Sequence, residues 1–100
     1  MGTERTCHGV AELNGFIYSA GGHSCTSIVN SVERFDPLTL SWISIKPLEI
    51  KRSFFRLVAM PEYNCLYAVG GHSEKFTLNS VERLDPRVSL LSDNTFKVIL

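Results

Sequence analysis

Two stretches of this chain are near copies of each other, 49 residues apart. Residues 21–37 contain Gly-Gly-His-Ser and then Asn-Ser-Val-Glu-Arg-Phe-Asp-Pro, and both motifs return in residues 70–86 with Leu84 in place of Phe35. Comparing residues 16–37 with 65–86 gives 12 identities in 22 positions, where unrelated sequences would give about one or two. A repeat of this period indicates a unit that cannot bury its own apolar surface and must stack on copies of itself.

Each copy is predicted to form a meander of short antiparallel strands. In the first copy the β-prone runs cover 6–13, 16–20, 31–36 and 41–45. Asn14-Gly15 separates the first two runs and is typical of a two-residue hairpin turn. Pro37 and Pro47 end the last two runs, because proline cannot donate a hydrogen bond to a strand ladder. We therefore expect four strands in sequence order.

The second copy is predicted to repeat the meander with a longer first turn. Its runs cover 55–60, 65–69 and 80–85, with 89–92 as the expected fourth strand. Residues 61–64 replace the Asn-Gly turn, which places the two extra residues where length changes are tolerated. As sequence units, the first repeat covers about 16–63 and the second about 64–100. The second is degenerate after residue 91, because Leu91 stands where Trp42 predicts a tryptophan and 92–100 matches nothing in the first copy.

Composition excludes several classes of partner. Ten basic and ten acidic residues cancel, and the longest basic cluster is Lys51-Arg52, so no phosphate-binding stripe for nucleic acid is present. No apolar run reaches the length of a membrane span, and the first residues are polar where a signal peptide would be apolar. Three cysteines without paired spacing fit neither a disulfide framework nor a zinc site. These features predict a cytoplasmic protein, with the nucleus as the alternative.

The motifs together resemble the kelch repeat, and more narrowly the repeats of the kelch-like (BTB-BACK-kelch) family. The resemblance covers about residues 5–91 and rests on His8-Gly9-Val10-Ala11, Gly15, Ile17-Tyr18, Gly21-Gly22, Asn30-Ser31-Val32-Glu33-Arg34, Asp36-Pro37 and Trp42. It implies an all-β fold of two four-stranded antiparallel blades, an incomplete fragment of a β-propeller. Two blades cannot close a ring, so we expect a fragment that is at best marginally stable on its own.

Several repeated residues are interpreted as structural. Gly21, Gly22, Gly70 and Gly71 follow a strand without the helix start and lysine of a nucleotide loop. Tyr18, Tyr67 and Trp42 are expected to anchor neighbouring blades. Glu33, Arg34, Glu82 and Arg83 alternate within a strand, and Arg5 and Arg52 are the expected partners of the two carboxylates. None of these residues is assigned to catalysis.

Three polar or irregular connections on one face of the propeller, residues 23–29, 46–54 and 72–78, are expected as loops and form the candidate binding site, because loops vary freely when the strands carry the fold. The resemblance implies that this face grips peptide-like segments of substrates, with arginines and serines contacting acidic motifs. By position, the candidate partner-binding residues are His23, Ser24, Ser27, Lys51, Arg52, His72, Ser73, Glu74, Lys75 and Phe76.

The first functional hypothesis is a protein-binding module from, or derived from, a substrate-recognition subunit of a cullin-3 ubiquitin ligase. The alternatives are an actin-associated or scaffolding kelch protein and, less favoured, a kelch-type enzyme. No cofactor, metal or catalytic site is expected, since His23 and His72 are repeat equivalents on different blades and do not converge on one ion. The expected partner is a protein substrate or a cytoskeletal protein. No segment resembles BTB or BACK, so cullin contact is not expected through this chain alone.

Overall fold

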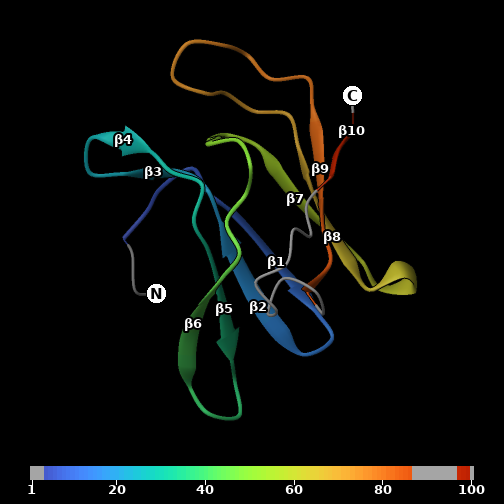
Figure 1. Ribbon diagram of the computed structural model, residues 1–100. Helices are drawn as coiled ribbons and strands as arrows, with labels where there is room; N and C mark the ends of the chain where they lie inside the picture. Colours follow the sequence, from blue (N-terminus) through green and yellow to red (C-terminus); the bar gives the residue numbers. More distant parts are fainter. Residues whose placement is uncertain (1–3, 87–96, 100) are drawn as a thin grey trace.

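The computed structural model describes residues 4–86 and 97–99, which form two four-stranded antiparallel sheets and a small hairpin (Figure 1). The first sheet, called blade 1, contains β1 (Gly9–Leu13), β2 (Phe16–Ala20), β5 (Val32–Asp36) and β6 (Ser41–Ile45), paired in that order. The second, called blade 2, contains β7 (Arg56–Met60), β8 (Cys65–Val69), β9 (Val81–Leu84) and β10 (Lys97–Ile99), also in sequence order. The prediction of an all-β fold with two antiparallel meanders is confirmed.

The turns follow the local sequence. Asn14 and Gly15 both have positive φ, 53° and 86°, as a tight hairpin between β1 and β2 requires. In blade 2 the same connection is the 3-10 turn η1 (Pro61–Tyr63), which ends at Asn64 with φ 53°. The side chains of Asn14 and Asn64 are hydrogen-bonded to each other. The two-residue insertion therefore lies in this hairpin turn, and the strands on either side keep their register.

Two elements differ from the sequence prediction. Residues 23–29, expected as a polar loop, contain the hairpin of β3 (His23–Ser24) and β4 (Ser27–Ile28). The predicted fourth strand at 89–92 lies outside the described residues, and β10 pairs with β9 instead, with Ile99 opposite Val81. In blade 1, Ile45 is opposite Val32, which is the repeat equivalent of Val81. Ile45 and Ile99 therefore occupy the same position in the two fourth strands, and they are 54 residues apart (99 − 45 = 54) instead of 49. The connection before β10 is thus five residues longer than its counterpart.

The hydrophobic core lies between the two blades. We call the sheet surface of blade 1 that carries Ala11, Tyr18 and Val32 its front face, and the surface of blade 2 that carries Leu57, Leu66 and Leu84 its back face. These side chains are buried together or packed against the buried cluster. Gly9 in β1 lies so close to β7 that a Cβ atom there would be 2.7 Å from Leu57 Cβ. The blades therefore pack front to back, with β1 against β7.

A long apolar helix that could cross a membrane does not occur among the residues that the structure describes.

Candidate functional site: the loop-face groove

Three connections lie at one end of the blades, in the upper part of Figure 1: the β2–β5 and β8–β9 segments and the linker from β6 to β7. Between them is a hollow of about 470 Å³, which we call the loop-face groove. Its lining residues come from both blades and the linker: Asn30, Glu49, Ile50, Lys51, Ser73, Glu74, Lys75 and Phe76. The groove therefore exists only where the two blades meet.

Half of the predicted binding residues line this groove. Lys51, Ser73, Glu74, Lys75 and Phe76 do so. His23, Ser24 and Ser27 belong to the β3–β4 hairpin, and His72 exchanges backbone hydrogen bonds with Ser53; these residues do not line it.

Three lining residues are not among the ten named candidates: Glu49 and Ile50 lie within the predicted loop 46–54, and Asn30 lies just beyond the predicted loop 23–29. Nothing in the linker sequence distinguishes Ile50 from its neighbours as a lining residue, because its place in the groove depends on the contact of its N–H with Glu82.

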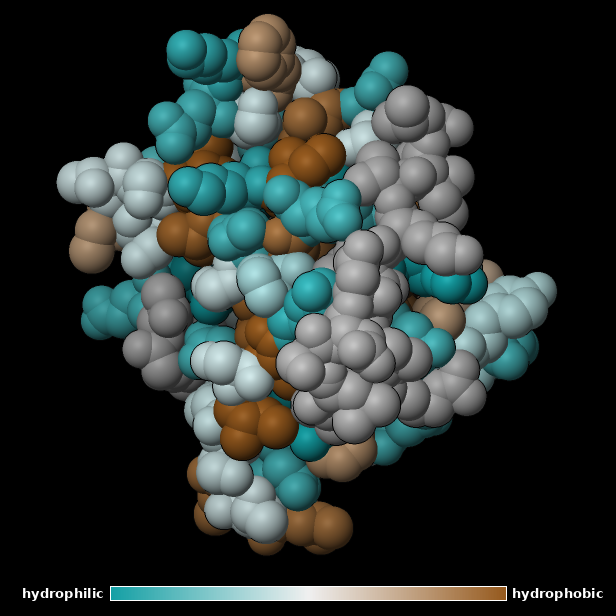
Figure 2. Space-filling view, in the orientation of Figure 1, coloured by the Kyte–Doolittle hydropathy of each residue, from teal (hydrophilic) through white to brown (hydrophobic). Residues whose placement is uncertain are grey.

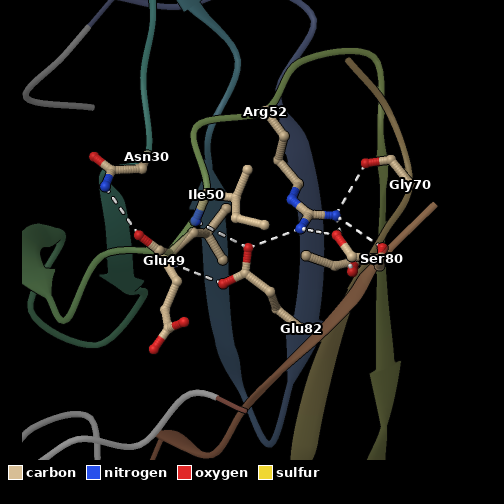
Figure 3. Close-up of polar contacts among 9 residues, drawn as sticks. Asn30, Glu49, Ile50, Arg52, Gly70, Ser80 and Glu82 are labelled. Carbon is tan, nitrogen blue, oxygen red and sulfur yellow. Dashed lines mark hydrogen bonds and ion pairs between the residues drawn. The ribbon is translucent and has the colours of Figure 1, made fainter. Parts of the chain in front are cut away.

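Arg52 does not belong to the exposed surface, contrary to its assignment to the binding loops. Its side chain is completely buried, and Nη2 lies 2.8 Å from Glu82 Oε2 (Figure 3). The same guanidinium donates to Gly70 O at 3.0 Å and to Ser80 O at 3.1 Å. A planar fork of donors suits such a cage of acceptors. We therefore remove Arg52 from the proposed binding residues and assign it to the interior of blade 2.

Glu82 connects this buried pair to the wall of the groove. Its Oε1 accepts a hydrogen bond from Glu49 N at 2.7 Å, and its Oε2 accepts one from Ile50 N at 3.2 Å (Figure 3). From the other side, Asn30 Nδ2 donates to Leu48 O at 2.9 Å and Leu48 N donates to Asn30 O at 2.8 Å. The linker is thus held by one residue of each blade, which fixes the groove wall without using the exposed side chains of Glu49 and Lys51.

Blade 1 contains the equivalent ion pair. Arg5 Nη2 lies 3.0 Å from Glu33 Oε1, and Arg5 Nη1 donates to Gly21 O and Ser31 O at 3.0 and 2.9 Å. The prediction that Arg5 and Arg52 pair with the repeated glutamates is confirmed. Both guanidinium groups are paired with a carboxylate inside the blades. The basic side chains that line the groove are therefore those of Lys51 and Lys75.

The groove combines an apolar surface with a mixed-charge rim. Phe76 exposes 69% of its surface, and Ile50 is half-buried beside it in the lining. The remaining charges alternate in sign, Glu49 with Lys51 and Glu74 with Lys75. Figure 2 shows hydrophobic and hydrophilic side chains interleaved in the upper part of the molecule, where these connections lie. An exposed aromatic anchor with a polar rim is the usual arrangement of a protein-binding patch.

Of the three aromatic residues expected to anchor neighbouring blades, only Tyr18 lies between the two described blades; Tyr67 and Trp42 lie on sheet surfaces outside the shared core. Tyr18 is buried in the inter-blade core, whereas Tyr67 is half-buried on the opposite surface of blade 2. Trp42 packs on Phe35 of its own blade, with ring centroids 5.1 Å apart. The Arg34 guanidinium lies 4.3 Å from the centre of the Phe16 ring. Burial raises the pKa of Tyr18, and the hydrogen bond and positive charge of Arg34 oppose that shift.

His8 gives a pH-dependent prediction. Burial, with a smaller contribution from the positive charge of Arg5, lowers the pKa of His8 from 6.5. The folded chain then binds fewer protons than the unfolded chain, so this contribution to stability is present above about pH 6.5 and is lost as the pH falls below it. Urea unfolding across this range should show a steeper loss for the wild type than for His8→Gln. Parallel pH profiles would contradict this assignment.

Comparisons with known proteins identify the repeat. The family model described as "Kelch motif" matches residues 4–49 and 63–95. The chain belongs to the kelch-repeat family. Kelch-like protein 13 of Homo sapiens and of Bos taurus are each 38% identical to it over 68 residues, 63% of this chain and 10% of the relative. Kelch-like protein 9 of Mus musculus is 38% identical over 65 residues, 60% of this chain.

These findings support a kelch protein-interaction module. The chain spans about a tenth of the length of the kelch-like relatives that it matches. Within the described residues, no three His, Cys, Asp or Glu side chains are grouped so that they could hold a metal ion. The kelch strands instead supply the scaffold, and the chemically varied side chains gather at the loop-face groove.

Proposed function

We propose that the loop-face groove binds an extended segment of another protein and that this kelch module acts by binding, without catalysis. The observation that carries the proposal is the position of the groove: its wall is fixed from both blades, through Asn30 and Glu82, while Phe76 and the charged rim remain exposed. A preformed groove loses little conformational freedom when a ligand binds. The alternating charges favour a segment that presents both signs around an apolar side chain over a purely acidic one.

Within this class, we propose that the module belongs to or derives from a substrate-recognition subunit of a cullin-3 ubiquitin ligase in the cytoplasm. The similarity to kelch-like proteins 13 and 9 supports this assignment over the actin-associated or scaffolding alternative. The two can be separated in cells. Immunoprecipitation of the protein that carries this chain should recover cullin-3 for an adaptor, whereas recovery of actin without cullin-3 would favour the alternative.

The groove itself is tested by substitution of its aromatic anchor. Phe76→Ser should lower the recovery of partners from cell lysate at least about fivefold, because the few anchoring side chains that dominate a binding patch each contribute more than 1 kcal/mol. The matched control is Leu38→Ser, which removes a 93% exposed apolar side chain at the turn between β5 and β6. Partners quantified by mass spectrometry should be unchanged for the control. Equal losses for both variants, or none for Phe76→Ser, would place the binding surface elsewhere.

A further inference from the structure

The turn between β1 and β2 places a reactive side-chain amide at the surface. Asn14 and Gly15 are both exposed, and a Cβ placed on Gly15 would meet nothing within 4 Å. Asparagine is a chemically labile residue. It cyclises most readily before glycine, because glycine has no side chain to hinder the attack of its own nitrogen on the asparagine Cγ. The turn therefore carries a chemical site that the binding function does not use.

The other asparagines of the described residues are less suited to this reaction. Asn30 is half-buried, and its side-chain nitrogen is hydrogen-bonded to the linker. Asn64 and Asn79 are followed by Cys65 and Ser80, which have side chains and are buried. Within the part of the chain that the structure describes, the β1–β2 turn is therefore the place where an exposed amide and a glycine occur together.

The reaction at such a turn is an intramolecular substitution. The nitrogen of Gly15 forms a bond to Cγ of Asn14, the bond from Cγ to Nδ2 breaks, and Nδ2 leaves as ammonia after taking up the proton that the Gly15 nitrogen loses. Water then opens the cyclic imide. Its attack on one carbonyl gives aspartate, and its attack on the other gives isoaspartate, so water is the only other reactant.

Glu12 holds the attacking nitrogen. Gly15 N donates a hydrogen bond to Glu12 Oε2 at 2.9 Å. The nitrogen attacks only as its proton leaves, and a carboxylate beside it opposes the negative charge that develops there. The hydrogen bond must also break before the nitrogen can turn toward Cγ of Asn14. While the hairpin is closed, Glu12 therefore slows the first step of the reaction.

Asn64 holds the leaving group. Its Oδ1 accepts a hydrogen bond from Asn14 Nδ2, the nitrogen that departs as ammonia. Asn64 is itself fixed at the end of η1, where its backbone N–H donates to Pro61 O at 3.1 Å. Asn14 belongs to blade 1 and Asn64 precedes β8 of blade 2. This second restraint on the amide therefore exists only while the two blades are packed together.

We propose that Asn14 is a site of spontaneous deamidation whose rate is set by the closed turn, with Glu12 restraining the nucleophile and Asn64 the leaving group. Local opening of the turn or separation of the two blades releases these restraints. The product has a carboxylate oxygen where Nδ2 donated to Asn64 Oδ1, so the contact between the two turns is lost after the reaction. The converted fraction thus records how often this end of the interface has opened.

The test follows each asparagine in the purified protein that carries this chain, kept at neutral pH. Digestion and mass spectrometry measure aspartate and isoaspartate at Asn14, Asn30 and Asn79. Glu12→Ala removes the acceptor for the nucleophile, and Asn64→Gly removes the acceptor for the leaving group while suiting the positive φ at that position. Each should raise the rate at Asn14 about fivefold, the factor that one ordinary hydrogen bond contributes. In concentrated urea, where both contacts are absent, the variants and the wild type should react at the same rate.

Glu62→Ala is the matched control, because Glu62 is an exposed residue of η1 whose loss should leave the rate at Asn14 unchanged. Asn30 and Asn79 serve as internal reporters of global unfolding and should stay intact in every folded sample. Three results would overturn the proposal: an intact Asn14 in the folded wild type and in both variants, a rate in either variant no higher than that of the wild type, or an acceleration that extends to Asn30 and Asn79.

Discussion

Replacing Glu82 with glutamine should lower the free energy of unfolding by about 3–5 kcal/mol, because it leaves the Arg52 charge buried without its partner. The Arg52 and Glu82 side chains are both fully buried, so water cannot replace the lost carboxylate. The change also weakens the acceptor for Glu49 N and Ile50 N, so the linker that forms the groove wall loses its anchor in blade 2. Urea unfolding followed by circular dichroism measures the loss.

Glu49→Gln is the matched control for that experiment. It makes the same chemical change at an exposed residue whose backbone N–H, not its carboxylate, takes part in the network. Exposed ionic groups contribute about 0–1 kcal/mol, so the control should unfold almost as the wild type does. A loss below about 1 kcal/mol for Glu82→Gln would mean that solvent reaches the pair when the blades separate slightly, and that the wall is held by Asn30 alone.

The repeat made the main features of the fold predictable from sequence. Asn14-Gly15 determined a hairpin turn through the backbone conformation that these two residues favour. The pairing of Arg52 with Glu82 could be predicted because Arg5 and Glu33 stand in the same relation one repeat earlier. Signals of this kind are local, or they recur, and either property makes them visible in a single sequence.

The burial of Arg52 and the place of Ile50 in the groove were not predictable from the sequence. Lys51 and Arg52 are adjacent and alike in charge, yet only Arg52 is buried, because the carbonyl oxygens of Gly70 and Ser80 surround it in the folded blade. Ile50 lines the groove because Glu82, 32 residues away, holds its N–H. No pattern in the linker itself encodes these contacts.

The fourth strand of blade 2 shows how a constant offset can mislead. An offset of 49 residues assigns Leu91 to the position of Trp42, whereas strand pairing gives 54. At that offset the sequence equivalent of Trp42 is Phe96, an aromatic residue outside the described residues. Loop lengths carry no hydrophobic period, so an insertion there shifts the alignment without any warning in the flanking strands.

Gly71→Ala is the second substitution with a large expected effect. Gly71 has φ +94°, and a Cβ there would be 2.5 Å from Ser53 O and 2.7 Å from Phe55 Cβ. The left-handed backbone alone costs an alanine about 1–2 kcal/mol, and forcing extra volume into a packed site adds about 1–3 kcal/mol. Ser53 cannot move away easily, because it exchanges two backbone hydrogen bonds with His72, at 2.9 and 2.8 Å.

Gly70→Ala separates these two contributions. Gly70 also has positive φ, +67°, but the nearest atom to a Cβ there is Leu78 O at 3.5 Å, an ordinary contact. Its substitution should therefore show only the backbone cost, about 1–2 kcal/mol, and Gly71→Ala should unfold in urea at a clearly lower concentration than Gly70→Ala. Equal midpoints would mean that β7 and its preceding linker shift freely to admit a methyl group. In that case the close approach of Gly71 to Ser53 and Phe55 would not fix the position of the β8–β9 loop. The rigidity of the groove would then depend on the contacts of Glu82 with the linker alone.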